Sequence, residues 1–215
     1  MNSKFAELSN QIRNEFPATK NSLSRRKPIL NVGINDADYI VNPVVNGERL
    51  YCPAYRSWKS IIERCHSKIR LGIRPTYAGA SVCYDWLSFS KFRCWYIKNY
   101  VDGWRIDKDI LSCSKVYSPD TCIFVPSWIN SLPTDSLAVR GSHPIGVRVR
   151  DGKFVARVNV GNGKQEELGR FDDQEDAHKA WLSAKIGYIN SRKQEMDDID
   201  IRIHKGLIRI VSSQR

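Results

Sequence analysis

The chain has 215 residues, 41% of them hydrophobic, and a formal net charge of +11 at pH 7. This composition excludes a wholly disordered chain, and no apolar run approaches the roughly 20 residues that a membrane-spanning helix needs, so we expect no membrane association. Residues 1–20 lack the uninterrupted apolar stretch of a secretory signal. We therefore expect a cytoplasmic protein, located in the host cell cytoplasm if a phage encodes it.

The cysteines and histidines bear on redox state and metals. In the cytoplasm the six cysteines should remain thiols. No cysteine spacing is C-x-x-C and the chain has only four histidines, so we expect no zinc site.

Basic and aromatic residues are concentrated in one part of the chain. Residues 51–100 contain nine Lys or Arg against two acidic residues, together with eleven aromatic residues. Such a mixture suits a domain whose rings build a small core while its cations follow a phosphate backbone. We therefore expect double-stranded DNA as the partner, with a solvated basic face as the alternative.

The first 135 residues predict a mainly helical part that ends in short extended segments. Apolar residues recur three or four positions apart in 3–15, in 55–65 and in about 88–100, which predicts three helices. Prolines and glycines predict loops and extended segments between the first two. Residues 101–125 suggest short extended pieces broken by turns, and a helical segment should start near Pro126.

The following segment predicts a small sheet with one helix. Three runs of alternating apolar and polar residues are separated by Asp151-Gly152 and by 161–163, the turn chemistry of tight hairpins. Asp172 or Asp173 can cap a helix after the third run. That helix should cover one sheet face with an apolar side formed by Ala177, Ala180, Trp181, Ala184 and Tyr188. The tail after residue 192 has helical spacing.

The predicted fold class is α+β. The predicted parts are an N-terminal helix and extended arm (1–50), a basic domain (51–135), a linker (136–142), a three-stranded antiparallel sheet packed on one helix (143–192) and a helical tail (193–215). The sequence leaves the oligomeric state open, a monomer included.

The predicted sheet segment carries the motifs GVRVR (146–150), KFVARV (153–158), LGRF (168–171) and EDAHKAW (175–181). With these motifs it resembles the DNA-binding domain of plant ethylene-response-factor (Apetala-type) transcription factors, a domain that also occurs fused to phage nucleases. The resemblance covers about 46 residues. It implies that the sheet face opposite the helix enters the major groove of DNA.

The resemblance implies a set of DNA contacts on that face. The predicted contact residues are Arg148, Arg150, Lys153, Arg157, Asn159, Gln165 and Arg170. Arg148 and Arg150 each suit a guanine edge or a phosphate. Asn159 and Gln165 stand where arginines are common, and Glu167 stands where a tryptophan is common, so the target sequence of the plant proteins does not carry over. The alternative is that these are ordinary exposed strand residues.

The preceding part carries YRSWKSIIERC (55–65), SVCYDWLSFSKF (81–92), RIDKDIL (105–111) and VYSPDTCIFVP (116–126). With these motifs residues 51–130 resemble phage HNH-type homing endonucleases. The resemblance implies two short strands and a helix around one divalent ion. The fold expected for this part is therefore a degenerate HNH (ββα-metal) domain.

The catalytic motif of that family is altered here. Asp107 falls at the metal-ligand position and Asn130 at the helix-borne ligand position, so the resemblance implies that both hold Mg²⁺ or Mn²⁺. Lys108 stands where the family has its general-base histidine, and a protonated lysine cannot accept a proton. Thr121 stands at the position of an asparagine that rigidifies the loop.

The residues beside Asp107 have two possible roles. Asp109 could assist the chemistry, because in an extended segment its carboxylate would point to the same side as that of Asp107, and Lys108 could contact the scissile phosphate. The catalytic set is therefore Asp107, Lys108 and Asp109. The alternative is that these residues form structural salt bridges.

The sequence thus predicts a homing-endonuclease-like protein that cleaves duplex DNA with a divalent metal ion. The first alternative is a catalytically inactive DNA-binding protein derived from an HNH endonuclease. A second is a protein that binds another protein through its basic face.

Overall fold

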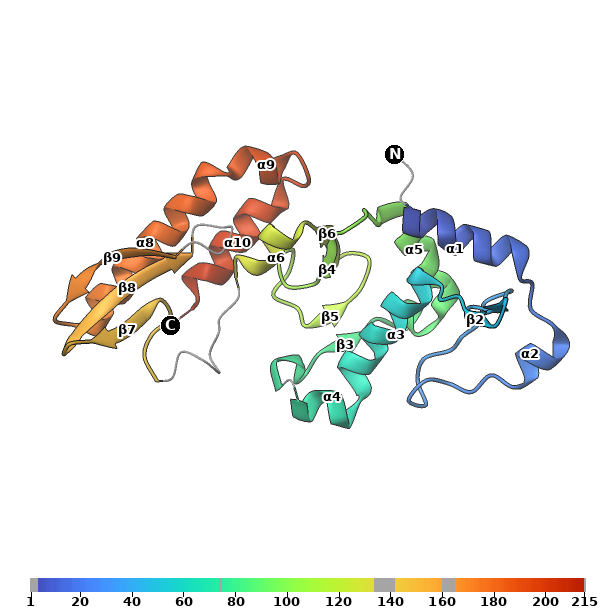
Figure 1. Ribbon diagram of the computed structural model, residues 1–215. Helices are drawn as coiled ribbons and strands as arrows, with labels where there is room; N and C mark the ends of the chain where they lie inside the picture. Colours follow the sequence, from blue (N-terminus) through green and yellow to red (C-terminus); the bar gives the residue numbers. More distant parts are fainter. Residues whose placement is uncertain (1–3, 74, 134–141, 160–164, 215) are drawn as a thin grey trace. The chain divides into compact units, whose positions relative to one another are not determined.

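The computed structural model describes residues 4–73, 75–133, 142–159 and 165–214 (Figure 1). These fall into two compact units, residues 1–124 and 125–215. The helices and small sheets confirm the predicted α+β class. Within the described residues, no helix is both long and apolar enough to span a membrane.

The first unit is mainly helical. Its helices are α1 (Lys4–Glu15), α2 (Lys20–Ser24), α3 (Pro53–His66), α4 (Lys68–Ile73) and α5 (Phe89–Asn99), with short 3₁₀ helices at Pro75–Tyr77 and Tyr84–Leu87. The predicted helices 3–15, 55–65 and 88–100 are confirmed to within a few residues. Short strand pairs accompany them: β1 (Val44–Val45) with β2 (Glu48–Arg49), β3 (Ser81–Val82) with β5 (Val116–Tyr117), and β4 (Arg105–Asp107) with β6 (Ile123–Val125).

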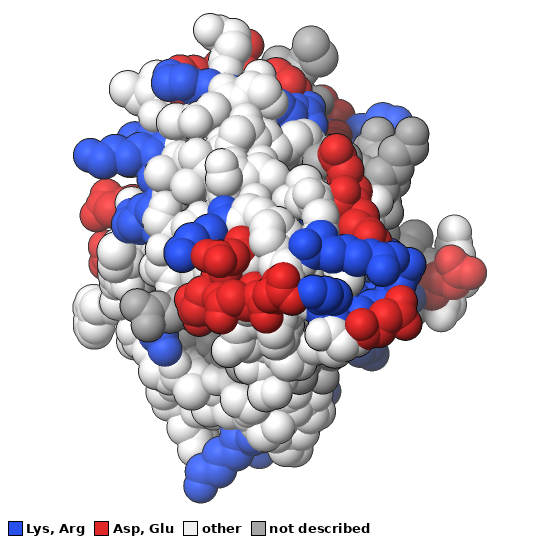
Figure 2. All heavy atoms as spheres, turned by 90° about the vertical axis from the view of Figure 1, so that its left-hand side faces the viewer, with Lys and Arg blue, Asp and Glu red and all other residues white. Residues whose placement is uncertain are grey.

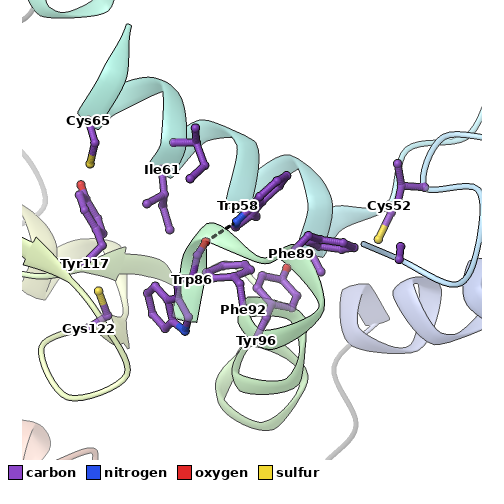
Figure 3. Close-up of a cluster of buried hydrophobic side chains, with 14 of the residues drawn as sticks. Cys52, Trp58, Ile61, Cys65, Trp86, Phe89, Phe92, Tyr96, Tyr117 and Cys122 are labelled. Atoms are coloured by element: carbon purple, nitrogen blue, oxygen red, sulfur yellow. Dashed lines mark hydrogen bonds between the residues drawn. The ribbon is translucent and has the colours of Figure 1, made fainter. Parts of the chain in front are cut away.

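The core of the first unit is built from aromatic rings (Figure 3). The stripe of α3 that contains Trp58 is fully buried, and so are Trp86, Phe89 and Phe92 beside it. The indole N–H of Trp58 donates to the backbone oxygen of Trp86 at 2.7 Å, which satisfies the one polar atom of a buried ring. Most aromatic rings of residues 51–100 therefore belong to the core, as expected, whereas Tyr51 and Tyr84 are exposed.

The second unit contains the predicted three-stranded sheet. Strands β7 (Val147–Arg150), β8 (Lys153–Asn159) and β9 (Gln165–Phe171) pair antiparallel in that order. The helices are α6 (Ser127–Ser131), α8 (Gln174–Ser191), α9 (Lys193–Asp197) and α10 (Arg202–Ser212), and the last two confirm the helical tail.

Local signals explain the hairpin and the start of α8. Asp151 and Gly152 have φ values of 51° and 72°, as the two-residue turn between β7 and β8 requires, and this turn confirms the first predicted hairpin. The second predicted turn, 161–163, lies outside the described residues, and so does most of the predicted linker 136–142. The Asp173 carboxylate accepts from the amides of Glu175 (2.8 Å) and Asp176 (3.2 Å), which confirms Asp173 as the N-cap.

Helix α8 covers one face of the sheet. Val147, Ala156 and Ala177 form the centre of the contact, with Phe154, Leu168 and Phe171 around it. The buried side of α8 differs from the predicted one. Ala184 and Tyr188 are only half-buried, whereas His178, Lys185 and Ile189 are buried. Two contacts that the spacing alone does not show contribute to this difference: α8 also packs against α10, and His178 Nδ1 lies 2.9 Å from the backbone oxygen of Ile145.

Candidate nucleic-acid interface

The strand pairing determines which residues lie on the sheet face that α8 leaves open. Val147 pairs with Ala156, and both contact α8, so these positions face the helix. Directly paired residues share a face, and neighbours along a strand point to opposite faces. The alternate pairs therefore lie on the open face: Arg148 with Val155, Arg150 with Lys153, Arg157 with Glu167, Asn159 with Gln165, and Val155 with Arg170.

All seven predicted contact residues thus lie on this open face of β7–β8–β9. They are Arg148, Arg150, Lys153, Arg157, Asn159, Gln165 and Arg170. Between them lies Val155, which is 2% exposed although it faces away from α8.

A β-bulge arranges the third strand. The register shifts between Ala156 and Arg157, so that Leu168 is an extra residue on β9. In a regular strand Glu167 and Arg170, three positions apart, would point to opposite faces. The extra residue shifts the alternation of side chains by one position, so Glu167 and Arg170 both lie on the open face. Gly169, with φ of 150°, supplies the backbone conformation next to the bulge.

The carboxylate of Glu167 lies among the arginines of this face. Glu167 Oε2 lies 3.3 Å from Arg157 Nη2 and 3.7 Å from Arg150 Nη1, and Glu167 Oε1 lies 3.7 Å from Arg170 Nε. Asp151 lies 3.6 Å from Arg150 and 3.8 Å from Arg170. Figure 2 shows basic and acidic side chains side by side on the face that it views. The sequence indicates Glu167 only as a departure from the family pattern; its central position depends on the bulge.

These ion pairs hold the arginines weakly. The side chains of Arg150 and Arg170 are 52% and 44% exposed. Exposed ion pairs contribute about 0–1 kcal/mol each, because water competes for both charges. An incoming phosphate or base edge could therefore take over these arginines at small energetic cost.

The predicted nuclease residues lie at the end of β4, in the first unit. Asp107 Oδ1 accepts from the backbone amides of Asp109 (2.7 Å) and Ile110 (2.9 Å), so the chain turns directly after Asp107. Burial raises the pKa of Asp107 above its ordinary value. The expectation of an extended segment that carries Asp107 and Asp109 to one side is wrong, because the strand ends at Asp107.

Lys108 is buried rather than directed at solvent. Its side chain is 8% exposed, and its Nζ lies 2.5 Å from Asp109 Oδ1 and 5.6 Å from the ring centre of Tyr117. A contact between Lys108 and a scissile phosphate would require this ammonium to leave its site. The salt-bridge alternative for Lys108 and Asp109 is therefore what the structure contains.

Thr121 stabilises its loop through hydrogen bonds, at the position where the HNH resemblance implies an asparagine. Its hydroxyl accepts from the amide of Ser118 at 3.1 Å and donates to the backbone oxygen of Val116 at 2.6 Å. Asn130 lies on α6 in the second unit, whereas Asp107 lies in the first.

The residues around Asp107 do not fit Mg²⁺ or Mn²⁺ as they lie. One oxygen of Asp107 is engaged by two amides, and the adjacent carboxylate is neutralised by the Lys108 ammonium. Among the described residues, no group of three or more His, Cys, Asp or Glu could hold a metal ion.

Comparison of the chain with protein-family models, with curated proteins and with solved structures gives no match.

Proposed function

We propose that this protein binds double-stranded DNA through the open face of β7–β8–β9. The observation that carries the proposal is the register, which brings Arg148, Arg150, Arg157 and Arg170 onto one face opposite α8. The major groove is about 12 Å wide and admits β-strands as well as helices. A small sheet supported by one helix offers a rigid platform for such a contact.

Binding would exchange the weak ion pairs of the free protein for stronger ones. Arg150 and Arg170 would leave Asp151 for phosphates or guanine edges, and the counterions released from DNA would supply much of the free energy. Lys153, which pairs with Asp172 in the free protein, lies at the edge of the face and suits a phosphate.

The first unit would add contacts with the DNA backbone. Exposed cations there include Arg56, Lys59, Lys68 and Lys98. The basic surface is smaller than the sequence suggests, because Arg93 is buried and donates to Asn10 Oδ1 at 2.6 Å. Arg64 is also half-buried, beside the hydroxyl of Tyr117.

The test is equilibrium binding of the full chain to a labelled random-sequence duplex at several salt concentrations. We expect affinity to fall steeply with salt, with a slope of log K against log salt of about −0.9 for each phosphate contacted. No binding at about 50 mM salt, where contacts of this kind are strong, would contradict the proposal. Retention of a protein partner with little salt dependence would favour the protein-binding alternative.

Metal-dependent cleavage of duplex DNA, in the manner of a homing endonuclease, is the second candidate function. Two observations favour it. The strands β4 and β6 are paired and α6 follows them in the chain, which is the two-strand and helix order that the HNH resemblance implies. The hydroxyl of Thr121 also stabilises the loop between β5 and β6. Two other observations favour the alternative of a DNA-binding protein without catalysis. Lys108 is buried, and one carboxylate oxygen of Asp107 already accepts hydrogen bonds from two backbone amides.

A plasmid nicking assay with Mg²⁺ or Mn²⁺ separates these alternatives. Nicking that is lost in Asp107→Ala, while DNA binding is kept, would support cleavage at this site. Nicking that is unchanged in Asp107→Ala would contradict the assignment of Asp107 to the nuclease site. DNA binding with no nicking by the wild type would leave DNA binding as the function.

A further inference from the structure

We infer that Glu167 is a base-reading residue of the sheet face, which accepts a hydrogen bond from the exocyclic amino group of cytosine in the major groove. This inference rests on the proposed DNA binding and adds a target preference to it. The preferred sites would contain a C·G pair at the position that Glu167 reaches, next to guanines read by arginines.

The first argument is position. Glu167 lies on the outer strand β9, but it pairs with Arg157 of the central strand, and its carboxylate lies within 3.7 Å of Arg150 of β7 and Arg170 of β9. A carboxylate held among arginines of all three strands lies where a docked face meets base edges, whereas side chains at the rim meet the phosphates of the two DNA strands. The bulge at Leu168 is what brings this carboxylate to the open face.

The second argument is unused acceptor capacity. A carboxylate can accept about four hydrogen bonds. Of the three arginine contacts of Glu167, only the one from Arg157, at 3.3 Å, has hydrogen-bond geometry, and those from Arg150 and Arg170 are longer, at 3.7 Å. The Glu167 side chain is 34% exposed, so solvent reaches it and an incoming donor could too.

The third argument is charge. A phosphate would repel the Glu167 carboxylate, so in a complex this side chain must face a hydrogen-bond donor. The donors in the major groove are the amino groups of cytosine and adenine, and glutamate pairs characteristically with cytosine N4. Arginine pairs with O6 and N7 of guanine, so Glu167 with Arg157 or Arg150 matches the two bases of a C·G pair or of adjacent pairs.

The arginines around Glu167 would gain from the same arrangement. Each has a long side chain with many rotamers, and the shared carboxylate keeps three guanidinium groups on one side of the sheet before DNA arrives. Part of the ordering required for base reading would then already be present in the free protein.

The experiment is a binding-site selection from a random duplex library with three full-length proteins: the wild type, Glu167→Gln and Glu166→Gln. Glu166 is the matched control, because it pairs with Val158 and so lies on the side of the sheet away from the open face, yet its substitution removes the same charge. Selected sites are then measured by competition binding at one salt concentration.

We expect the wild type to prefer C·G at one position by about 5-fold or more, the fold-change that corresponds to roughly 1 kcal/mol for a base contact. Glu167→Gln should lose this preference and gain adenine at the same position, because glutamine pairs with adenine N6 and N7. Glu166→Gln should keep the wild-type preference.

Two results would overturn the inference, and they are distinguishable. If Glu167→Gln binds all sequences more tightly but selects the same sites as the wild type, Glu167 acts only through its charge, and DNA binding itself stands. If none of the three proteins binds any duplex at low salt, the proposed DNA binding fails and the inference fails with it.

Discussion

Gly146 lies against the indole ring of Trp181, so close that a Cβ atom at Gly146 would be 2.1 Å from the ring. This contact joins the start of β7 to α8, and it sets how near the helix lies to the sheet. Gly146 also has a φ of 81°, which side chains rarely adopt. Both the space and the backbone conformation therefore require glycine.

Gly146→Ala should destabilise the sheet unit strongly. Gly152 provides the control, because it has a similar φ of 72° but nothing within 4 Å of its would-be Cβ. Gly152→Ala should cost about 1–2 kcal/mol, from backbone strain alone. Gly146→Ala should cost clearly more, because Trp181 must also move. Denaturant unfolding followed by far-UV circular dichroism measures both, and equal losses would show that the close contact does not matter.

Asp173→Ala should lower the free energy of unfolding of the sheet unit by about 0.5–2 kcal/mol, because two amides at the start of α8 lose their acceptor. Asp172→Ala removes a neighbouring carboxylate that forms only an exposed ion pair with Lys153, so its effect should stay below about 1 kcal/mol. Thermal unfolding of both variants compares them. A larger effect at Asp172 would contradict the cap assignment.

Lys185→Met should raise the stability of the protein at neutral pH. Burial lowers the pKa of Lys185 below its ordinary value of 10.5, so the unfolded chain binds this proton more tightly than the folded one. The wild type should therefore gain stability as the pH rises through the lowered pKa toward 10.5. Lys185→Met should lose that gain.

Lys179→Met is the control for this pH dependence, because Lys179 lies on the same helix with its side chain 73% exposed. Urea unfolding from pH 7 to pH 10 gives the free energy of unfolding for each protein. If Lys185→Met and Lys179→Met follow the same pH curve, the burial of Lys185 has no energetic effect.

Arg148→Ala should weaken DNA binding and reduce the salt slope by about 1, if Arg148 contacts a phosphate. A guanine contact would instead leave the slope nearly unchanged and lower the preference for one base by about 1–3 kcal/mol. Lys179→Ala removes a cation from α8, which covers the other side of the sheet, and should change neither quantity. Salt-titrated fluorescence anisotropy distinguishes these results, and an unaffected Arg148→Ala would remove this residue from the interface.

The features that the sequence predicted well depend on local chemistry. Asp151-Gly152 specifies its turn through positive φ values, Asp173 specifies a helix start through its carboxylate, and the apolar–polar alternation of the strand segments indicates the sheet. Each signal acts over a few residues, so one chain suffices to detect it.

The features that the sequence did not predict depend on packing between distant residues. The buried side of α8 includes Lys185, and α8 packs against α10 as well as against the sheet. Lys108 is buried because Tyr117 and Asp109 accommodate its ammonium, whereas the motif alone suggested an accessible residue. The role of Glu167 required the bulge, and a single extra residue in a strand has no local signature apart from Gly169.

The bulge at Leu168 divides β9 into two stretches whose alternation is independent. Because Leu168 is the extra residue that faces no partner of its own on β8, its deletion would join Glu167 directly to Gly169 and leave the pairs of β8 with β9 unchanged. Gln165 and Glu167 would then stay on the open face, and Glu166 would stay on the other. The bulge is thus a position where one codon can be lost without turning the recognition residues over, whereas a one-residue deletion elsewhere within β9 would turn part of the strand to the opposite face.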